Sequence, residues 1–484
     1  MPSELLKYPE PPDLLKKRSG LSLLKWFGPG VIMASVSIGS GETLLASRGG
    51  AIFGYSVIWC LLAGMVLKGV QIYTSARYMA LSGEHPMESW RYLPGPRAWF
   101  PWFLLVITVM CLPFLLASLS MLIGTFVNWI GGVDLQKPAA EVYSRLWATI
   151  LIGTAALMSL RQGYGFLEIS QKVIVAVLLG CILVAAVACQ PAIGGLIAGM
   201  VPSVPVHPDW VKESYPDIAG RPAWLEVITY VGLIGAGLPA YVGYLGFLRD
   251  KGWSFFQVER ISHHREKETF RAIDMSSENV NRGRKWLLPV RIDVGLSFLC
   301  VTIFSIAFMV LGADLLHPRQ LVPDKMNLVN YQAEFLTQLH PSLLYVYQVG
   351  IFAAIGGTVF ATFDVWTKTT YESLLPIVRA PEMLEYQKVK RVVMIYCIVV
   401  GLIVMWGGLF WKPLSNPVSL VQVPALIGGA FGCGLWCLGV WWVDRKNLPV
   451  GLRLSWWQQI LLILSGVILA VMGLVGSWLK LFGG

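Results

Sequence analysis

Residues 28–56 read GPGVIMASVSIGSGETLLASRGGAIFGYS, an apolar stretch interrupted near its middle by Gly39, Ser40 and Gly41. An apolar run of this length is typical of a membrane-spanning helix. Glycine at the interruption predicts that the helix unwinds there. Backbone groups released at bilayer depth must find partners in protein, water or a ligand. An interrupted span of this kind therefore indicates the lining of a solute site.

A second interruption lies in residues 231–244, VGLIGAGLPAYVGY, where Gly235, Gly237 and Pro239 disturb another apolar run. Two interrupted spans in corresponding positions of two halves of a chain are typical of secondary transporters, whose solute site lies at the interruptions. We expect residues 39–41 and 235–238 to be unwound and to lie beside one another.

The composition is that of a membrane protein with many spans. Of the 484 residues, 55% are hydrophobic and 14% are charged, against roughly 25% charged in a soluble domain. The net charge of +10 is explained by basic loops that face an anionic membrane leaflet, so it gives no reason to expect nucleic-acid binding. We expect an integral protein of a bacterial inner (plasma) membrane that is surrounded by the lipid bilayer.

Apolar runs predict an all-α protein with eleven transmembrane helices. The predicted spans are 30–52, 53–80, 98–130, 144–160, 166–189, 223–248, 287–312, 342–376, 391–411, 417–442 and 454–481. The N-terminal tail and the loops after even-numbered spans hold most of the lysines and arginines. The positive-inside rule therefore places the N-terminus in the cytoplasm.

Spans 1–5 and 6–10 form two five-helix units of opposite orientation, each opening with an interrupted helix, which is the plan of an inverted repeat. The predicted parts are a cytoplasmic tail (1–26), a first repeat (27–190), an extracellular connection (191–222), a second repeat (223–442), and an additional helix 11 with the C-terminus (443–484). A cytoplasmic loop within the second repeat, 249–286, has an apolar pattern that predicts an amphipathic helix.

Several of these segments resemble the Nramp metal-ion transporters. Residues 28–30 (Gly-Pro-Gly) and 53–56 (Phe-Gly-Tyr-Ser) match the family's first two helices, residues 234–239 look like its sixth, and residues 422–424 (Gln-Val-Pro) resemble the Gln-Leu-Pro of its tenth. The resemblance covers spans 1–10 in order. It implies a leucine-transporter-like inverted 5+5 repeat with broken helices 1 and 6, which works by alternating access.

The residues at the family's metal site depart from its pattern. Members that carry manganese or iron have Asp-Pro-Gly-Asn at the first break, where residues 39–42 read Gly-Ser-Gly-Glu. Met-Pro-His of the sixth helix becomes Leu-Pro-Ala at 238–240, which removes the soft thioether that selects transition metals. Of the family's ligand positions only Gln422 is clearly kept. We therefore expect no transition-metal transport, no bound metal and no cofactor.

The remaining residues form a glycine-rich, mostly uncharged candidate site. Glycine lets a ligand approach the backbone, and the start of each half-helix offers N–H groups and partial positive charge that suit an anion. The predicted substrate-binding residues are Gly39, Ser40, Gly41, Glu42, Gly235, Gly237, Leu238, Tyr241 and Gln422. The competing interpretation is that these glycines only allow close packing of membrane helices.

Four residues at membrane depth are candidates for a coupling-ion site or a charge partner, namely Glu42, Lys68, Thr358 and Thr362. Ionisable groups at this depth indicate function by default. Lys68 is expected to stabilise an anion or to pair with Glu42 or another buried carboxylate. Thr358 and Thr362 share one face of span 8, as in sodium sites seen on this fold.

Other charged residues are predicted to be structural. Asp364 and Lys368 are spaced i, i+4 and are expected to form an ion pair on the surface of span 8. Asp293 and Glu226 lie close to the ends of their spans, and we expect them to be interfacial.

Three functions remain open. The leading one is secondary transport of a small oxyanion such as bicarbonate, as an anion symport where a coupling cation accompanies it. The alternative is transport of a hydrated hard cation such as Mg²⁺, which keeps its waters and needs only Glu42, Gln422 and carbonyl groups. The second alternative is a non-transporting membrane receptor on the same fold. An enzyme is not expected, because the sequence contains no recognisable nucleophile–base pair, phosphate loop or metal-ligand cluster.

Overall fold

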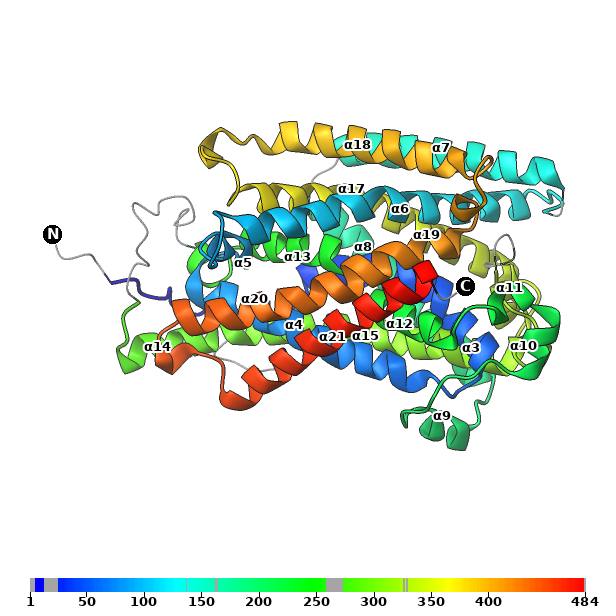
Figure 1. Ribbon diagram of the computed structural model, residues 1–484, viewed down its shortest axis with the longest axis horizontal. Helices are drawn as coiled ribbons and strands as arrows, with labels where there is room; N and C mark the ends of the chain where they lie inside the picture. Colours follow the sequence, from blue (N-terminus) through cyan, green and yellow to red (C-terminus); the bar gives the residue numbers. More distant parts are fainter. Residues whose placement is uncertain are drawn as a thin grey trace.

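The computed structural model describes residues 5–12, 25–135, 137–161, 164–257, 273–324, 327 and 330–482. Within these ranges the regular structure is helical, apart from an isolated β-bridge between Leu6 and Ile273. The long helices run roughly along the long axis of the molecule (Figure 1). One end carries α5 (Pro86–Trp90) and α14 (Ser277–Lys285), and the opposite end carries α10 (Asp209–Ser214) and α11 (Pro216–Ala219).

Ten helical runs in the described part of the chain are long and apolar enough to cross a membrane. Together they contain α4 (Ile58–Ser82), α6 (Trp99–Ile130), α7 (Pro138–Arg161), α8 (Tyr164–Ala188), α12 (Ala223–Leu233) with α13 (Leu238–Asp250), α14 with α15 (Leu287–Leu311), α17 (Leu343–Leu374), α18 (Tyr386–Gly407), α19 (Pro417–Pro424) with η10 (Ala425–Phe431) and α20 (Gly432–Asn447), and α21 (Trp456–Phe482). Each overlaps one of the predicted spans from the second to the eleventh. The first predicted span is helical but is not among these ten, so the count of eleven stays a prediction.

The first span differs from the prediction at its interruption. It comprises α2 (Pro29–Ser37), a π-helix η2 (Ile38–Ala46) and α3 (Ser47–Phe53), so residues 39–41 are not unwound. A π-helix has wider turns with i→i+5 hydrogen bonds, and it therefore accommodates the disturbance without releasing the backbone. The Thr43 hydroxyl also donates to the Ile38 carbonyl at 2.6 Å, which ties the start of η2 internally.

The sixth span is broken, as the sequence predicts. Helix α12 ends at Leu233 and α13 begins at Leu238, and the chain between them leaves the helical conformation. Gly235 and Ala236 have φ angles of +68° and +71°, a left-handed conformation that glycine adopts without strain and alanine does not. The strained backbone at Ala236 therefore needs stabilising contacts from outside the segment. Side chains of the candidate site provide these contacts.

Asp293 of α15 holds the start of the first span from within the packed protein, and its depth relative to the membrane interface stays a prediction. Its carboxylate accepts hydrogen bonds from the backbone N–H groups of Gly28 (2.8 Å) and Gly30 (2.9 Å) and from the Tyr244 hydroxyl (2.9 Å). The side chain is completely buried. A helix N-terminus has unpaired N–H donors that a carboxylate satisfies, so Asp293 ties α2 to α15 and α13.

The predicted ion pair between Asp364 and Lys368 is not formed. Asp364 instead accepts from Lys390 of α18 at 2.7 Å. Lys368 lies 2.8 Å from Asp250 and 3.5 Å from Glu372. Asp364 and Lys368 thus each bind a residue of another helix, and Lys368 also contacts Glu372 on its own helix, α17. The predicted amphipathic helix in the loop 249–286 falls largely on residues 258–272, which lie outside the described residues.

Candidate functional site

The π-helix of the first span lies against the break of the sixth. Glu42, on η2, is buried, and its Oε1 accepts hydrogen bonds from the Ser37 hydroxyl at 2.7 Å and the Gly235 backbone N–H at 3.0 Å. The prediction that the two interruptions lie beside one another is confirmed by this contact. The acidic side chain of one interrupted span thus bonds the backbone of the other.

Lys68 of α4 supplies the support that the break needs. Its Nζ donates to the carbonyl oxygens of Gly232 and Ala236, each at 2.6 Å, and the side chain is completely buried. These carbonyls flank the break, where the helical hydrogen-bond ladder is interrupted. Lys68 and Glu42 form no ion pair with each other, so the pairing considered from the sequence is wrong. The break carbonyls are the partner of Lys68 because the interrupted ladder leaves them without N–H donors.

Some of the N–H groups expected to be free around the start of α13 have partners within the protein. The Gly235 N–H bonds to Glu42, and the N–H groups of Ala240 and Tyr241 bond back to the Gly237 carbonyl at 2.9 and 3.1 Å. Pro239, at the second position of α13, has no N–H to offer. The backbone N–H groups that remain for a solute around the break, within the described part of the chain, are therefore those of Gly237 and Leu238, and any further donors must come from side chains.

Three of the predicted site residues keep a buried polar atom without a hydrogen-bond partner in the described part of the chain. These atoms are Oε2 of Glu42, the hydroxyl of Tyr241 and Nε2 of Gln422. All three side chains are buried, with at most 3% of the surface exposed. Buried polar groups are rarely left unpaired, so such atoms call for water, an ion or a ligand.

A cavity of about 40 Å³ adjoins the break. Backbone at Gly232, Ala236 and Gly237 lines it, together with apolar side chains and Thr362. A volume of this size admits about three water-sized groups. The cavity therefore suits a solute of a few heavy atoms.

The other predicted residues have packing contacts. A Cβ at Gly39 would lie 1.9 Å from the Thr358 hydroxyl, and one at Gly237 would lie 2.9 Å from Cα of Gly429. The interpretation that glycine allows close helix packing therefore holds at these two positions, whether or not they also contact a solute. Leu238 is completely buried at the first position of α13.

The remaining predicted residues lie in η2 of the first span and on α17. Ser40 and Gly41 lie in η2, and the Ser40 side chain is not described. The Thr358 hydroxyl lies 2.9 Å from the Ala354 carbonyl and 3.1 Å from that of Ser35, and the Thr362 hydroxyl donates to the Thr358 carbonyl at 2.7 Å. Both hydroxyls thus have partners within the protein.

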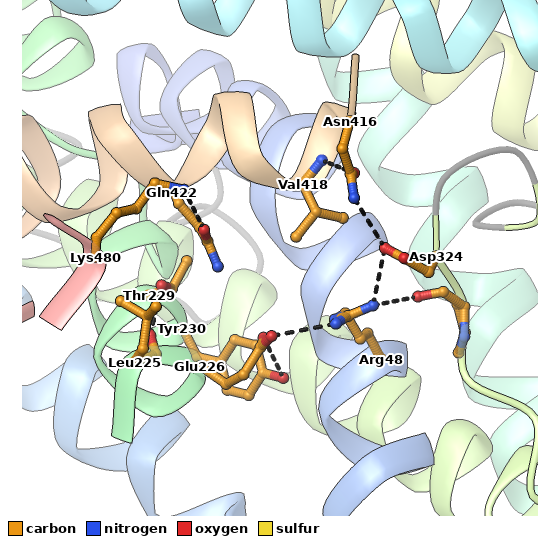
Figure 2. A network of polar contacts seen from close by, with 11 residues as sticks. Arg48, Leu225, Glu226, Thr229, Tyr230, Asp324, Asn416, Val418, Gln422 and Lys480 are labelled. Carbon is orange, nitrogen blue, oxygen red and sulfur yellow. Dashed lines mark hydrogen bonds and ion pairs between the residues drawn. The ribbon is translucent and has the colours of Figure 1, made fainter. Parts of the chain in front are cut away.

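A charged network on the α10–α11 side of the break was missed from the sequence. Arg48 of α3, only 2% exposed, lies 3.2 Å from both Glu226 of α12 and Asp324, and it donates to the Pro323 carbonyl at 2.8 Å (Figure 2). Glu226 also accepts from the Tyr230 hydroxyl at 3.3 Å, so it has several partners within the protein. A charged Arg48 in an apolar span is a signal that could have revealed this network.

Gln422 lies on the same side of the molecule as this charged network. Asn416, which caps α19, donates to Asp324 at 3.3 Å, and Gln422 follows on that helix (Figure 2). The Gln422 Oε1 accepts from Lys480 of α21 at 2.5 Å. The additional eleventh helix therefore reaches a predicted site residue.

Comparisons with known proteins agree with this geometry. Residues 30–479 match the model of the family described as natural resistance-associated macrophage protein-like, or Nramp. No match was found among curated proteins. The structure is similar to a manganese transporter of Eremococcus coleocola, with a TM-score of 0.65, 14% identity, and coverage of 99% of this chain and 90% of that one.

Two transporters from outside that family share the fold. MhsT in complex with L-phenylalanine has a TM-score of 0.57 at 13% identity, with 93% of this chain and 98% of that one covered. Mhp1, a nucleobase-cation-symport-1 family transporter, has a TM-score of 0.51 at 12% identity, with 94% and 92% covered. The chain is an integral membrane protein that belongs to the Nramp family, an Nramp-like secondary transporter with the leucine-transporter fold.

Proposed function

We propose that the protein carries a small, singly charged oxyanion, with bicarbonate as the leading candidate. The observation that carries the proposal is the position of Lys68, whose Nζ bonds both carbonyls that flank the break. Gly232 and Ala236, which carry these carbonyls, both line the cavity, and their carbonyl oxygens could otherwise coordinate a cation. In this chain an ammonium group occupies them and adds a positive charge.

The charge of Lys68 works against a divalent cation at the same place. Two charges of +1 and +2 about 4 Å apart repel by about 8 kcal/mol at an effective dielectric constant near 20. A monoanion at that distance is attracted by about 4 kcal/mol on the same scale. That attraction offsets the similar repulsion from an ionised Glu42, which was the main objection to an anion.

Two side chains on the helices that adjoin the cavity, although not among the residues that line it, carry donor groups for the oxygens of such an anion. The Tyr241 hydroxyl and the Gln422 Nε2 are buried without partners in the described structure. The cavity of about 40 Å³ also limits the solute to a few atoms. Glu42 is then proposed to bind the coupling proton or cation, with Thr358 and Thr362 as further candidates for a coupling-ion site.

Manganese is not the proposed substrate, although a similar structure is that of a manganese transporter. By the sequence resemblance, the family's Asp and Asn ligands correspond to Gly39 and Glu42 of η2, and its thioether ligand corresponds to Leu238. Carboxylate and carbonyl oxygens suit Mn²⁺ as well as Mg²⁺, so manganese is disfavoured by the lost ligands and by the charge of Lys68, which repels any divalent cation at the break.

Hydrated Mg²⁺ is the second candidate, and one observation favours it. The Glu42 Oε2 is a buried carboxylate oxygen without a partner among the described residues, and Mg²⁺ is commonly held by one or two carboxylates while it keeps several waters. A hydrated ion is larger than the cavity at the break. This candidate therefore requires the site to open further than it does here.

Flux measurements in proteoliposomes test the proposal. Labelled bicarbonate, Mg²⁺ and Mn²⁺ are compared with and without sodium and pH gradients, using empty liposomes as the control. Bicarbonate is assayed at alkaline pH, where little dissolved CO₂ is available to cross the lipid. We expect saturable bicarbonate flux that Lys68→Met abolishes, and no Mn²⁺ binding by calorimetry.

Other outcomes separate the alternatives. Mg²⁺ flux without bicarbonate flux overturns the oxyanion proposal in favour of the hydrated cation. Micromolar Mn²⁺ binding that Gln422→Ala removes overturns the argument from the missing ligands. Flux of none of the three ions, with specific binding of a small solute, favours the receptor.

A further inference from the structure

We propose that Lys480, on the additional helix α21, is a positioning residue that makes Gln422 a hydrogen-bond donor toward the solute path. The inference rests on the proposed function, because it assigns to Gln422 the recognition of an anion's oxygens. Lys480 lies outside the two predicted repeats, and Figure 2 shows it meeting Gln422 from the side of α21.

The chemistry of the contact forces the orientation of the amide. The Lys480 Nζ lies 2.5 Å from the Gln422 Oε1 and 3.3 Å from the Ser419 carbonyl. A lysine ammonium group has three donors and no acceptor, so only the oxygen end of the amide can face it. The NH₂ group of Gln422 then points away from Lys480 (Figure 2), and it finds no partner among the described residues.

The opposite orientation would give the site a different chemistry. An amide oxygen that faced the path would be a ligand for a hard cation, since glutamine carbonyls are among the oxygen donors that such ions use. With Oε1 bonded to Lys480, Gln422 offers two N–H donors instead. These donors suit the oxygens of an anion.

The packing of α21 keeps Lys480 in place. A Cβ at Gly473 would lie 2.4 Å from the backbone nitrogen of Phe431 in η10, and one at Gly476 would lie 2.5 Å from the Leu426 side chain. The helix therefore lies close against the segment that follows Gln422. Helix α21 thus contributes to specificity without touching the solute.

The test compares Lys480→Met, Lys480→Arg, Gln422→Leu and the double variant Lys480→Met with Gln422→Leu, with exposed Lys412→Met as the control. We expect Lys480→Met to raise the KM for bicarbonate about tenfold with a maximal rate within twofold of wild type. Lys480→Arg restores the KM, because guanidinium also has only donors. The double variant has the KM of Gln422→Leu alone. Additive KM effects, or a KM unchanged in Lys480→Met, overturn the inference.

Failure of the proposed function gives a distinct result. A wild-type protein that carries Mg²⁺ and no bicarbonate refutes the oxyanion proposal. The inference then predicts that the Lys480→Met substitution changes the KM in the opposite direction. Lys480→Met would lower the KM for Mg²⁺ by freeing the amide oxygen, and an unchanged KM overturns the inference. The double-variant cycle comprises wild type, Lys480→Met, Gln422→Leu and the double variant. Whichever ion the protein carries, the shifts in Tm of these variants must be non-additive. Additive shifts exclude the contact on which the inference depends.

Discussion

The first and sixth spans are both interrupted, yet they are interrupted in different ways. In the first, the π-helix η2 keeps the chain helical, and its polar chemistry comes from the Glu42 side chain. In the sixth, the backbone leaves the helix between α12 and α13. Lys68 from a third helix donates to the two buried carbonyls that the break leaves without N–H donors. The first interruption is therefore stabilised by the helical hydrogen bonds of its own segment. The break in the sixth span depends instead on the charge of Lys68, which another helix supplies.

The largest effect is expected from bulk at the sixth-span break. Gly237→Val should abolish bicarbonate flux, because a Cβ there lies 2.9 Å from the Cα of Gly429 and backbone cannot move aside as a side chain can. Gly153→Val is the matched control, since a Cβ at that helical glycine meets nothing within 4 Å. Full flux in a folded Gly237→Val protein would contradict the placement of the solute at this break.

Removing the charge that supports the break comes next. Lys68→Met should lower the free energy of unfolding by about 3 kcal/mol, because two buried carbonyls lose their donor. Thermal unfolding in detergent measures the change. Lys388→Met, at an exposed position, should stay within about 0.5 kcal/mol of wild type. Equal stability of the two variants would show that the sixth-span break supports itself.

Glu42→Gln should have a smaller effect on folding than Lys68→Met. The amide oxygen can still accept from Ser37 and Gly235, so we expect a loss of about 1 kcal/mol or less. The pH dependence of bicarbonate flux should change while the KM for bicarbonate stays within a few-fold of wild type. A variant that loses bicarbonate recognition and keeps the wild-type pH profile would assign Glu42 to the substrate rather than to coupling.

An effect of similar size is expected where α17 meets the first span. Thr358→Val removes the hydroxyl contacts to Ser35 and Ala354, which should cost about 1 kcal/mol of stability. Flux measured with and without sodium then tests the coupling-ion proposal. Loss of sodium dependence in this variant, with flux retained, would support a sodium site at Thr358, and an unchanged sodium response would remove Thr358 from the candidates.

The sequence predicted the spans and the sixth-span break because apolar length and glycine clusters report on single segments. It did not separate an unwound chain from a π-helix, since glycine at positions 39 and 41 is compatible with both. The partners of charged residues were also missed. Asp364 and Lys368 have the spacing of a pair on one helix, but each binds a residue from another helix. Such choices depend on how helices pack, and no local pattern records them.

The same limit applies to the candidate site. Glu42 and Tyr241 were selected at or near the interruptions and Gln422 from the resemblance to the family's tenth helix, and each has a buried atom without a partner among the described residues. Arg48 was overlooked even though a charge in an apolar run marks it. Lys480 could not be selected from the sequence, because its role depends on α21 lying against η10.

The first span is anchored near both of its ends by charges from other elements. Asp293 binds the N–H groups of Gly28 and Gly30, and Glu226 and Asp324 bind Arg48. At 1.5 Å per residue the two anchors are about 30 Å apart, with the π-helix between them. A stiff rod that tilts about a point near its middle moves its ends in opposite directions. A tilt of the whole span would therefore displace both ends, so the two sets of anchoring contacts cannot both stay intact while the span tilts.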